Sequence, residues 1–239
     1  MKKIKRELFL NIFSNAVVAL VIVFVFAFTL TSPTGLVSTA GKNYEPYYNG
    51  NRQYKKVSLM FNVYQNTKIV EDILGVLENH NAKATFFVGG CWADDNADCL
   101  NKIVGQGHEV GNHGYFHKDH DKLDYEQNKQ EIYLTETVVT ALCGEKTTLF
   151  APPSGAFNKS TLEVCLDLDY KVIMWSKDTI DWRDKNSALV KKRATENLEN
   201  GDLILMHPTE HTLSALDDIL SYYESVGFTA VTVSENIAE

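Results

Sequence analysis

From residue 56 onward, short apolar segments of strand length alternate with longer segments that carry apolar residues at helical spacing. Residues 56–62 (KVSLMFN) and 202–208 (DLILMHP) are typical strands, whereas residues 67–80 repeat apolar positions with helical periodicity. We count about seven strands, several of them continuously apolar, as strands covered on both faces should be. The alternation predicts parallel βαβ units and an α/β fold. A closed (β/α)7-type barrel fits that number of strands, with a doubly wound open sheet as the alternative.

Polar side chains follow the predicted strands at the points where those strands end. In both architectures the carboxyl ends of the strands meet at one edge, where binding and catalytic sites form. Residues far apart in the sequence are therefore expected to converge on one mouth, namely Asn62, His113, Ser154, Asp178, Asp181 and His207.

The bulk charge restricts the class of partner. The 239 residues carry a formal net charge of -8, so the chain lacks the basic surface that nucleic-acid-binding proteins use. We expect no nucleic acid partner.

The first 55 residues differ from the rest of the chain. Residues 1–7 are basic and residues 8–30 are mostly apolar, which is typical of a transmembrane signal anchor. Residues 31–55 are polar and read as an extracytoplasmic linker before a domain at 56–239. The expected location is the cell membrane, single-pass, with the domain outside. Cleavage after Ala40 and secretion is the alternative.

Histidines supply the clearest chemical pattern. His113 and His117 lie four residues apart after a predicted strand, a spacing that can place two imidazoles on one metal ion. His207 ends a buried strand, where it could act as an acid near neutral pH, and Asp181 could orient it. His108 is expected to be structural or exposed, and His120, in the charged stretch HKDHDK, is expected to be solvated.

The four cysteines leave two alternatives open. In an exported domain Cys91 and Cys99 could close the short loop CWADDNADC as a disulfide. Alternatively, all four could be free thiols packed as small apolar side chains.

The ordered segments FNV, HGYFH, FAPPSGAFN, DTIDW and LILMH, with KATFFVGG and GHEVGNH, resemble the polysaccharide deacetylase family, that is, the NodB-homology domain or family 4 carbohydrate esterases. The resemblance covers roughly residues 56 to 237. It implies a distorted barrel and a metal-dependent hydrolase that removes acetyl groups from polysaccharides such as peptidoglycan. The implied partner is an acetylated glycan, and the implied cofactor is a divalent metal, with zinc the first choice.

The resemblance also implies roles for individual residues. His113 and His117 match the metal-binding histidines, and His207 matches the catalytic histidine. Asp181 matches the aspartate that tunes this acid, and Leu205 matches the apolar floor under the acetyl methyl group. Three further side chains are implied to contact substrate, and these are Ser154, Trp182 and Tyr64.

The first motif departs from the family pattern. Asn62 stands at the position of the base and Val63 at that of the metal-binding aspartate, while Ala151 replaces an arginine that orients the base. An amide cannot take a proton from water at neutral pH. The sequence therefore predicts a carbohydrate deacetylase with an altered base, for which Asp178 is the nearest replacement. The alternative is an inactive deacetylase-fold module that binds glycan at the cell surface.

Overall fold

The computed structural model describes residues 44–238. In this part of the chain a single parallel sheet has the strand order β5-β4-β3-β2-β1-β7-β6, and β8 pairs with β1 beside this path. The strands are β1 (Lys56–Val63), β2 (Thr85–Val88), β3 (Glu109–Asn112), β4 (Leu149–Phe150), β5 (Lys171–Val172), β6 (Lys177–Asp178), β7 (Asp202–Met206) and β8 (Thr229–Ala230).

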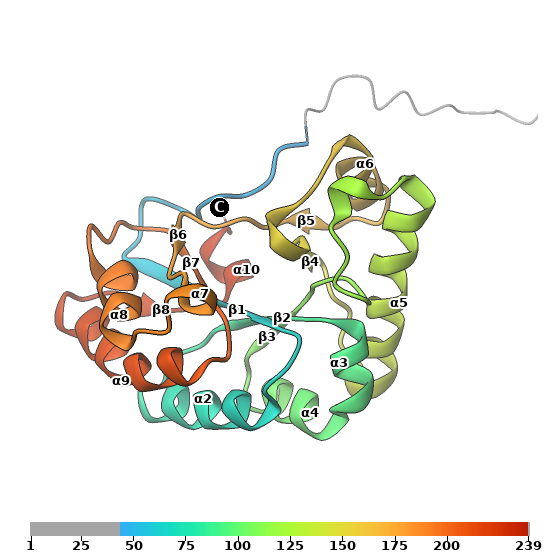
Figure 1. Cartoon of the computed structure of the whole chain (residues 1–239). Coiled ribbons are helices and arrows are strands. Elements are labelled where there is room, and N and C mark those ends of the chain that lie inside the picture. Colours follow the sequence, from blue (N-terminus) through green and yellow to red (C-terminus); the bar gives the residue numbers. More distant parts are fainter. Residues whose placement is uncertain (1–43, 239) are drawn as a thin grey trace, which may run out of the picture. The chain divides into compact units, whose positions relative to one another are not determined.

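Helices connect the strands and surround the sheet (Figure 1). They are α2 (Thr67–Asn79), α3 (Gly90–Asp95), α4 (Ala97–Gly105), α5 (Tyr125–Cys143), α6 (Lys159–Asp167), α7 (Asp181–Asp184), α8 (Ser187–Thr195), α9 (Glu210–Ser225) and α10 (Val233–Asn236). Two short 3-10 turns, η1 (His120–Lys122) and η2 (Pro153–Gly155), lie in the loops. The curled sheet confirms the α/β prediction. It stays open, because no pairing joins β5 to β6 within the described residues.

Strand β1 lies in the middle of the sheet and separates two apolar clusters. Its odd-numbered residues Val57 to Val63 pack with residues of α2, α4 and α9 in the main core. Met60 packs on the opposite side, in a smaller cluster with Phe87 and Leu203. Because side chains alternate along a strand, Asn62 shares the side of Met60, and Val63 turns to the main core.

The last predicted strand, residues 228–234, is much shorter than expected. Only Thr229 and Ala230 pair with β1. The hydroxyl of Thr232 then accepts a hydrogen bond from the backbone N–H of Glu235, at 3.3 Å, and this N-cap starts α10. A local cap thus ends the strand that periodicity alone would continue.

Residues 44–55, the end of the expected linker, pack along the sheet. The backbone N–H of Tyr47 donates to Val172, and that of Gly50 donates to Gly201. Arg52 reaches the start of β7, where its guanidinium donates to the buried carboxylate of Asp202 at 3.2 Å. This part of the segment is therefore integral to the domain.

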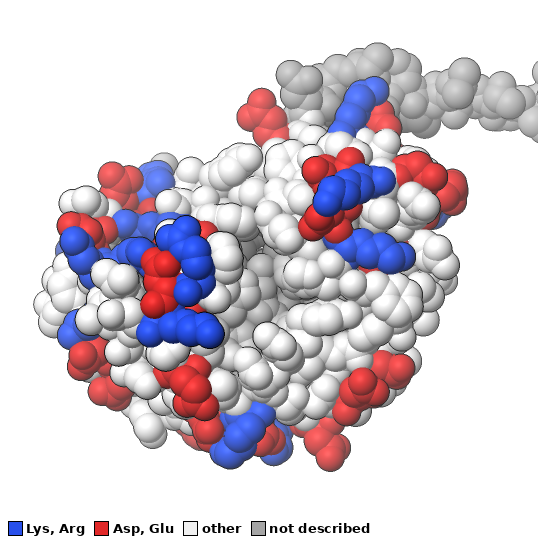
Figure 2. Space-filling view, in the orientation of Figure 1, with Lys and Arg blue, Asp and Glu red and all other residues white. Residues whose placement is uncertain are grey.

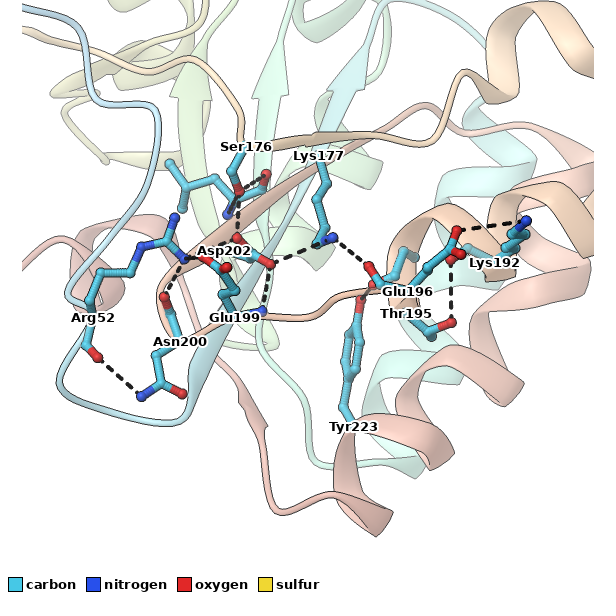
Figure 3. Close-up of polar contacts among 12 residues, drawn as sticks. Arg52, Ser176, Lys177, Lys192, Thr195, Glu196, Glu199, Asn200, Asp202 and Tyr223 are labelled. Carbon is cyan, nitrogen blue, oxygen red and sulfur yellow. Dashed lines mark hydrogen bonds and ion pairs between the residues drawn. The ribbon is translucent and has the colours of Figure 1, made fainter.

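Asp202 is the centre of a polar network (Figure 3). One carboxylate oxygen accepts hydrogen bonds from Ser176 and Arg52, and the other accepts the backbone N–H of Glu199 at 2.9 Å. The ammonium of Lys177 lies 3.9 Å from the second oxygen. The network thereby joins β7, the start of β6 and the segment that precedes β1.

Two further features considered in the sequence analysis are the cysteines and the N-terminal anchor. All four cysteines are free thiols, which is the second of the two alternatives left open by the sequence, and Cys99 is buried in the main core. The predicted anchor at residues 8–30 lies outside the described residues. Among residues 44–238 no helix combines the length and the apolar character needed to cross a membrane.

Candidate active-site cleft

A cleft opens at the carboxyl ends of β1, β3 and β7 and consists of two adjoining lobes of about 580 and 440 Å³. The first lobe extends toward α2 and α9, and the second extends toward η2 and β6. The face seen in Figure 2 is hollowed near its centre, and most residues around the hollow are uncharged. Both lobes share five of the predicted site residues, namely Asn62, His113, His117, Trp182 and His207. The convergence expected from the strand ends is thus present in the structure.

Asn62 stands on the cleft side of β1 and is 7% exposed. Its amide oxygen is buried and has no hydrogen-bond partner among the described residues. A buried polar atom without a partner is costly, because it has lost its water and gained nothing in exchange. Asn62 lines the cleft, but this unpaired oxygen is itself almost inaccessible to solvent.

The two histidines of HGYFH lie side by side, with ring centroids 5.0 Å apart. The ring Nδ1 of His113 donates to the carbonyl of Ala151 at 2.7 Å, which leaves Nε2 as the nitrogen available to a ligand. Burial, and after it the His117 ring, lowers the pKa of His113 to about 3, so its imidazole is neutral. Neutral imidazole is the form that accepts a hydrogen bond or binds a metal.

Glu131, which sequence reasoning missed, holds the loop that carries His117. This residue of α5 is buried, and its carboxylate accepts the backbone N–H of Phe116 at 2.7 Å and pairs with Lys118 at 2.8 Å. His117 lies between these two anchors with a φ of 54°, in the left-handed region. In the sequence, Glu131 looks like any other polar residue of the predicted helix, so nothing marked it as buried.

Asp181 and His207 meet as predicted. His207 donates to the buried carboxylate of Asp181 twice, from Nδ1 at 2.8 Å and from its backbone N–H at 2.7 Å. The hydroxyl of Thr212 on α9 is a third donor, which the sequence did not indicate. Burial alone would raise the pKa of Asp181, but the hydrogen bonds from His207 and Thr212 lower it, so Asp181 is a carboxylate. His207 thus presents Nε2 to the cleft.

The predicted substrate contacts take different positions. Leu205 lies on the floor of the second lobe, and Ser154 on its wall, with a φ of 57°. Trp182 is 57% exposed at the rim shared by both lobes. Tyr64 lines the first lobe, with its ring 5.1 Å from that of His117.

Two further histidines are structural. His108 is buried and accepts the backbone N–H of Ala84, in line with its expected structural role. The expectation that His120 is solvated is wrong, because its ring is fully buried against Phe150 and bonds to Asn128 of α5 at 2.6 Å.

The donor set does not fit a firmly held divalent metal. Catalytic zinc ordinarily has three protein ligands. Here two imidazoles face one neutral amide, and Val63, at the position of the family's metal-binding aspartate, is buried in the core. Within residues 44–238 no three His, Cys, Asp or Glu side chains converge as a metal-binding group. Of the metal site implied by the resemblance, the pair His113 and His117 is therefore the part that is in place.

Comparison with known proteins agrees with the fold and the cleft. Residues 49–173 match the family model described as polysaccharide deacetylase. The chain is 34% identical to the protein YlxY of Bacillus subtilis, over 82% of this chain and 61% of that protein. It is 32% identical to the peptidoglycan-N-acetylglucosamine deacetylase PgdA of Listeria monocytogenes, over 77% of this chain but 39% of PgdA. The chain thus spans less than two thirds of either relative.

Solved structures give the same result. A CE4 family pseudoenzyme from Bacillus anthracis superposes with a TM-score of 0.80 at 32% identity, over 83% of this chain and 70% of that one. A mutant of a CE4 family pseudoenzyme described as having restored enzymatic activity also superposes with a TM-score of 0.80, at 30% identity, over 83% of this chain and 73% of that one. With the family model matching more than half of its residues, the chain belongs to the polysaccharide deacetylase family.

Proposed function

We propose that this protein binds an amino-sugar glycan of the cell wall in the two-lobed cleft, and that its own removal of acetyl groups is slow. The family membership and a relative named as a peptidoglycan deacetylase support the class of polymer. The basic and apolar N-terminus supports a location outside the cytoplasm, on a single membrane anchor or secreted after cleavage.

The state of the first motif carries this proposal. Hydrolysis of an acetamide needs a group that takes a proton from the attacking water, and a positioned base is typically worth about 10²–10⁴-fold in rate. Asn62 occupies that position with an amide, which cannot accept the proton. Val63 is fully buried in the main core and offers no ligand. The site therefore has a candidate acid in His207 but no matching base.

A second candidate function is active deacetylation, and the intact pairing of His207 with Asp181 favours it. This arrangement suits an acid that protonates a leaving amine, and a protein that only binds glycan has no need for it. Asp178 lines the second lobe together with Asn62 and is the carboxylate available as a substitute base.

Acetate release from acetylated peptidoglycan and chitin oligomers separates the two functions. We compare the wild type with Asn62→Asp and with Asn62→Asp/Val63→Asp, with zinc added. The base that Asn62→Asp supplies should let both variants release acetate at least about 10²-fold faster than the wild type, which should stay near background. Circular dichroism checks folding, because Val63→Asp places a carboxylate in the core.

Asp181→Asn in the double-variant background is the matched control and should remove most of the gained rate. A wild-type rate equal to that of a folded double variant would refute the slow-hydrolysis proposal. In that case Asp178→Asn in the wild type would show whether Asp178 serves as the base.

A further inference from the structure

The second lobe of the cleft is rich in hydrogen-bond acceptors and poor in positive charge. Its polar lining consists of Asn62, His113, His117, Ser154, Asp178 and His207, and its remaining lining of Gly155, Trp175, Trp182 and Leu205. Within the described chain no lysine or arginine lines this lobe. A guest that supplies donors and positive charge would match such a surface.

Two acceptors on the floor of the lobe have no partner in the protein. The amide oxygen of Asn62 is buried and unpaired. The Nδ1 of His113 is committed to the carbonyl of Ala151, so Nε2 is left as a lone-pair acceptor at the cleft. No hydrogen bond among the described residues fixes the Asn62 amide, so its oxygen can turn toward the lobe, and a guest with more than one donor can then pair with both acceptors.

Asp178 adds a negative charge to the same lobe. One of its oxygens accepts the backbone N–H of Ile180 at 2.8 Å, which fixes the side chain. No lysine or arginine of the described residues forms an ion pair with it, and the nearby Arg183 pairs with Asp184 instead. Asp178 is therefore a half-buried carboxylate without a direct ion pair, and the Arg183 guanidinium acts on it only at longer range.

Trp175 forms an aromatic wall of the lobe. The electron-rich face of such a ring attracts a cation. The indole approaches Gly155 so closely that a Cβ at that position would lie 2.7 Å from the ring. A glycine here therefore allows the ring to line the lobe. Trp182 lines the lobe as well, with the guanidinium of Arg183 5.9 Å from its ring centroid.

We propose that the second lobe binds the protonated amino group of a de-N-acetylated sugar, so that the protein prefers glycan from which acetyl groups have already been removed. An ammonium carries three donors and a positive charge, which suit Asn62, His113 and Asp178. An acetamide has one N–H donor, and its carbonyl oxygen would meet further acceptors. Leu205 offers apolar surface to either sugar. A deacetylation reaction must supply this ligand, and the inference rests on the proposed glycan-binding function.

The test is calorimetric binding of a glucosamine tetramer and an N-acetylglucosamine tetramer to the full chain in non-ionic detergent. It is run at about pH 6.5, where most of the amines are protonated, with EDTA present. We expect the glucosamine tetramer to bind at least about ten-fold tighter, the effect of one hydrogen-bonded charge. Asp178→Asn keeps the acceptor for Ile180 and should reduce this preference to about two-fold.

Asp218→Asn is the matched control, because it makes the same change of charge on an exposed site of α9, outside the cleft. It corrects for general attraction between a cationic oligomer and an acidic protein, and should keep the preference. Equal or tighter binding of the acetylated tetramer would overturn the inference but leave the proposed function in place. A preference that survives Asp178→Asn, or that appears only when EDTA is omitted and zinc added, would also overturn it. Binding of neither tetramer would overturn the proposed function as well.

Discussion

Replacing Asp202 by Asn should destabilise the domain by about 2–4 kcal/mol. The carboxylate is 3% exposed and accepts hydrogen bonds on both oxygens, from Ser176 and Arg52 on one and from the backbone N–H of Glu199 on the other. An amide has one acceptor oxygen, so in either orientation its NH2 group faces a donor. In either orientation the change loses at least one hydrogen bond to a charged acceptor and leaves a buried donor unpaired.

Urea unfolding followed by circular dichroism measures this loss as a change in the free energy of unfolding. Asp218→Asn is the control, because Asp218 pairs with Lys191 on the surface, where an ion pair contributes less than about 1 kcal/mol. If Asp202→Asn unfolds within about 0.5 kcal/mol of the wild type, the reasoning from buried acceptor count is refuted.

Three further predictions concern the helices and the cleft. Partial burial alone would lower the pKa of His80, but hydrogen bonds to two carboxylates of α9 raise it. The stability that this contact adds is complete below about pH 6.5 and is lost as pH rises through the folded pKa. In urea unfolding, the free energy of unfolding of His80→Gln should therefore be lower than that of the wild type at pH 5.5, and the difference should be much smaller at pH 9. The lowered pKa of Asp181 has the opposite sign: its contribution is present above about pH 4 and is lost as pH falls through the folded pKa. The free energy of unfolding of the wild type should therefore fall as pH drops below about 4, and Asp181→Asn should flatten that part of the pH profile. Gly89→Ala should lower the melting temperature, because a Cβ there would lie 2.3 Å from the Tyr64 ring, and unchanged melting would contradict the placement of that ring.

The position of the cleft could be predicted from the sequence because it depends on local rules. Strand ends place polar residues at one edge, and alternation along β1 separates Asn62 from Val63. The residues that hold the site loops in place could not be predicted in this way, because their contacts depend on packing between distant elements. Glu131 is an ordinary acidic position until α5 lies behind the HGYFH loop, and His120 is buried by Asn128, although its own neighbours are charged.

The packing of residues 44–55 against the sheet could not be predicted from the sequence for the same reason. The polar composition of residues 44–55 indicates a linker, yet backbone hydrogen bonds and the partner of Arg52 on β7 fix this segment to the sheet. A polar sequence hides such contacts, because backbone groups pair without regard to side-chain type.

The central place of β1 has a consequence for how the chain reaches its native state. This strand is synthesised early, but one of its two main neighbours, β7, follows more than a hundred residues later. Until β7 arrives, β1 has an unpaired edge beside apolar residues, which is the condition under which nascent chains associate with each other. Such non-local pairing also slows folding. The first half of this domain is therefore most open to association during synthesis, and variants that weaken the β1–β7 register should reduce yield before they alter the properties of the folded protein.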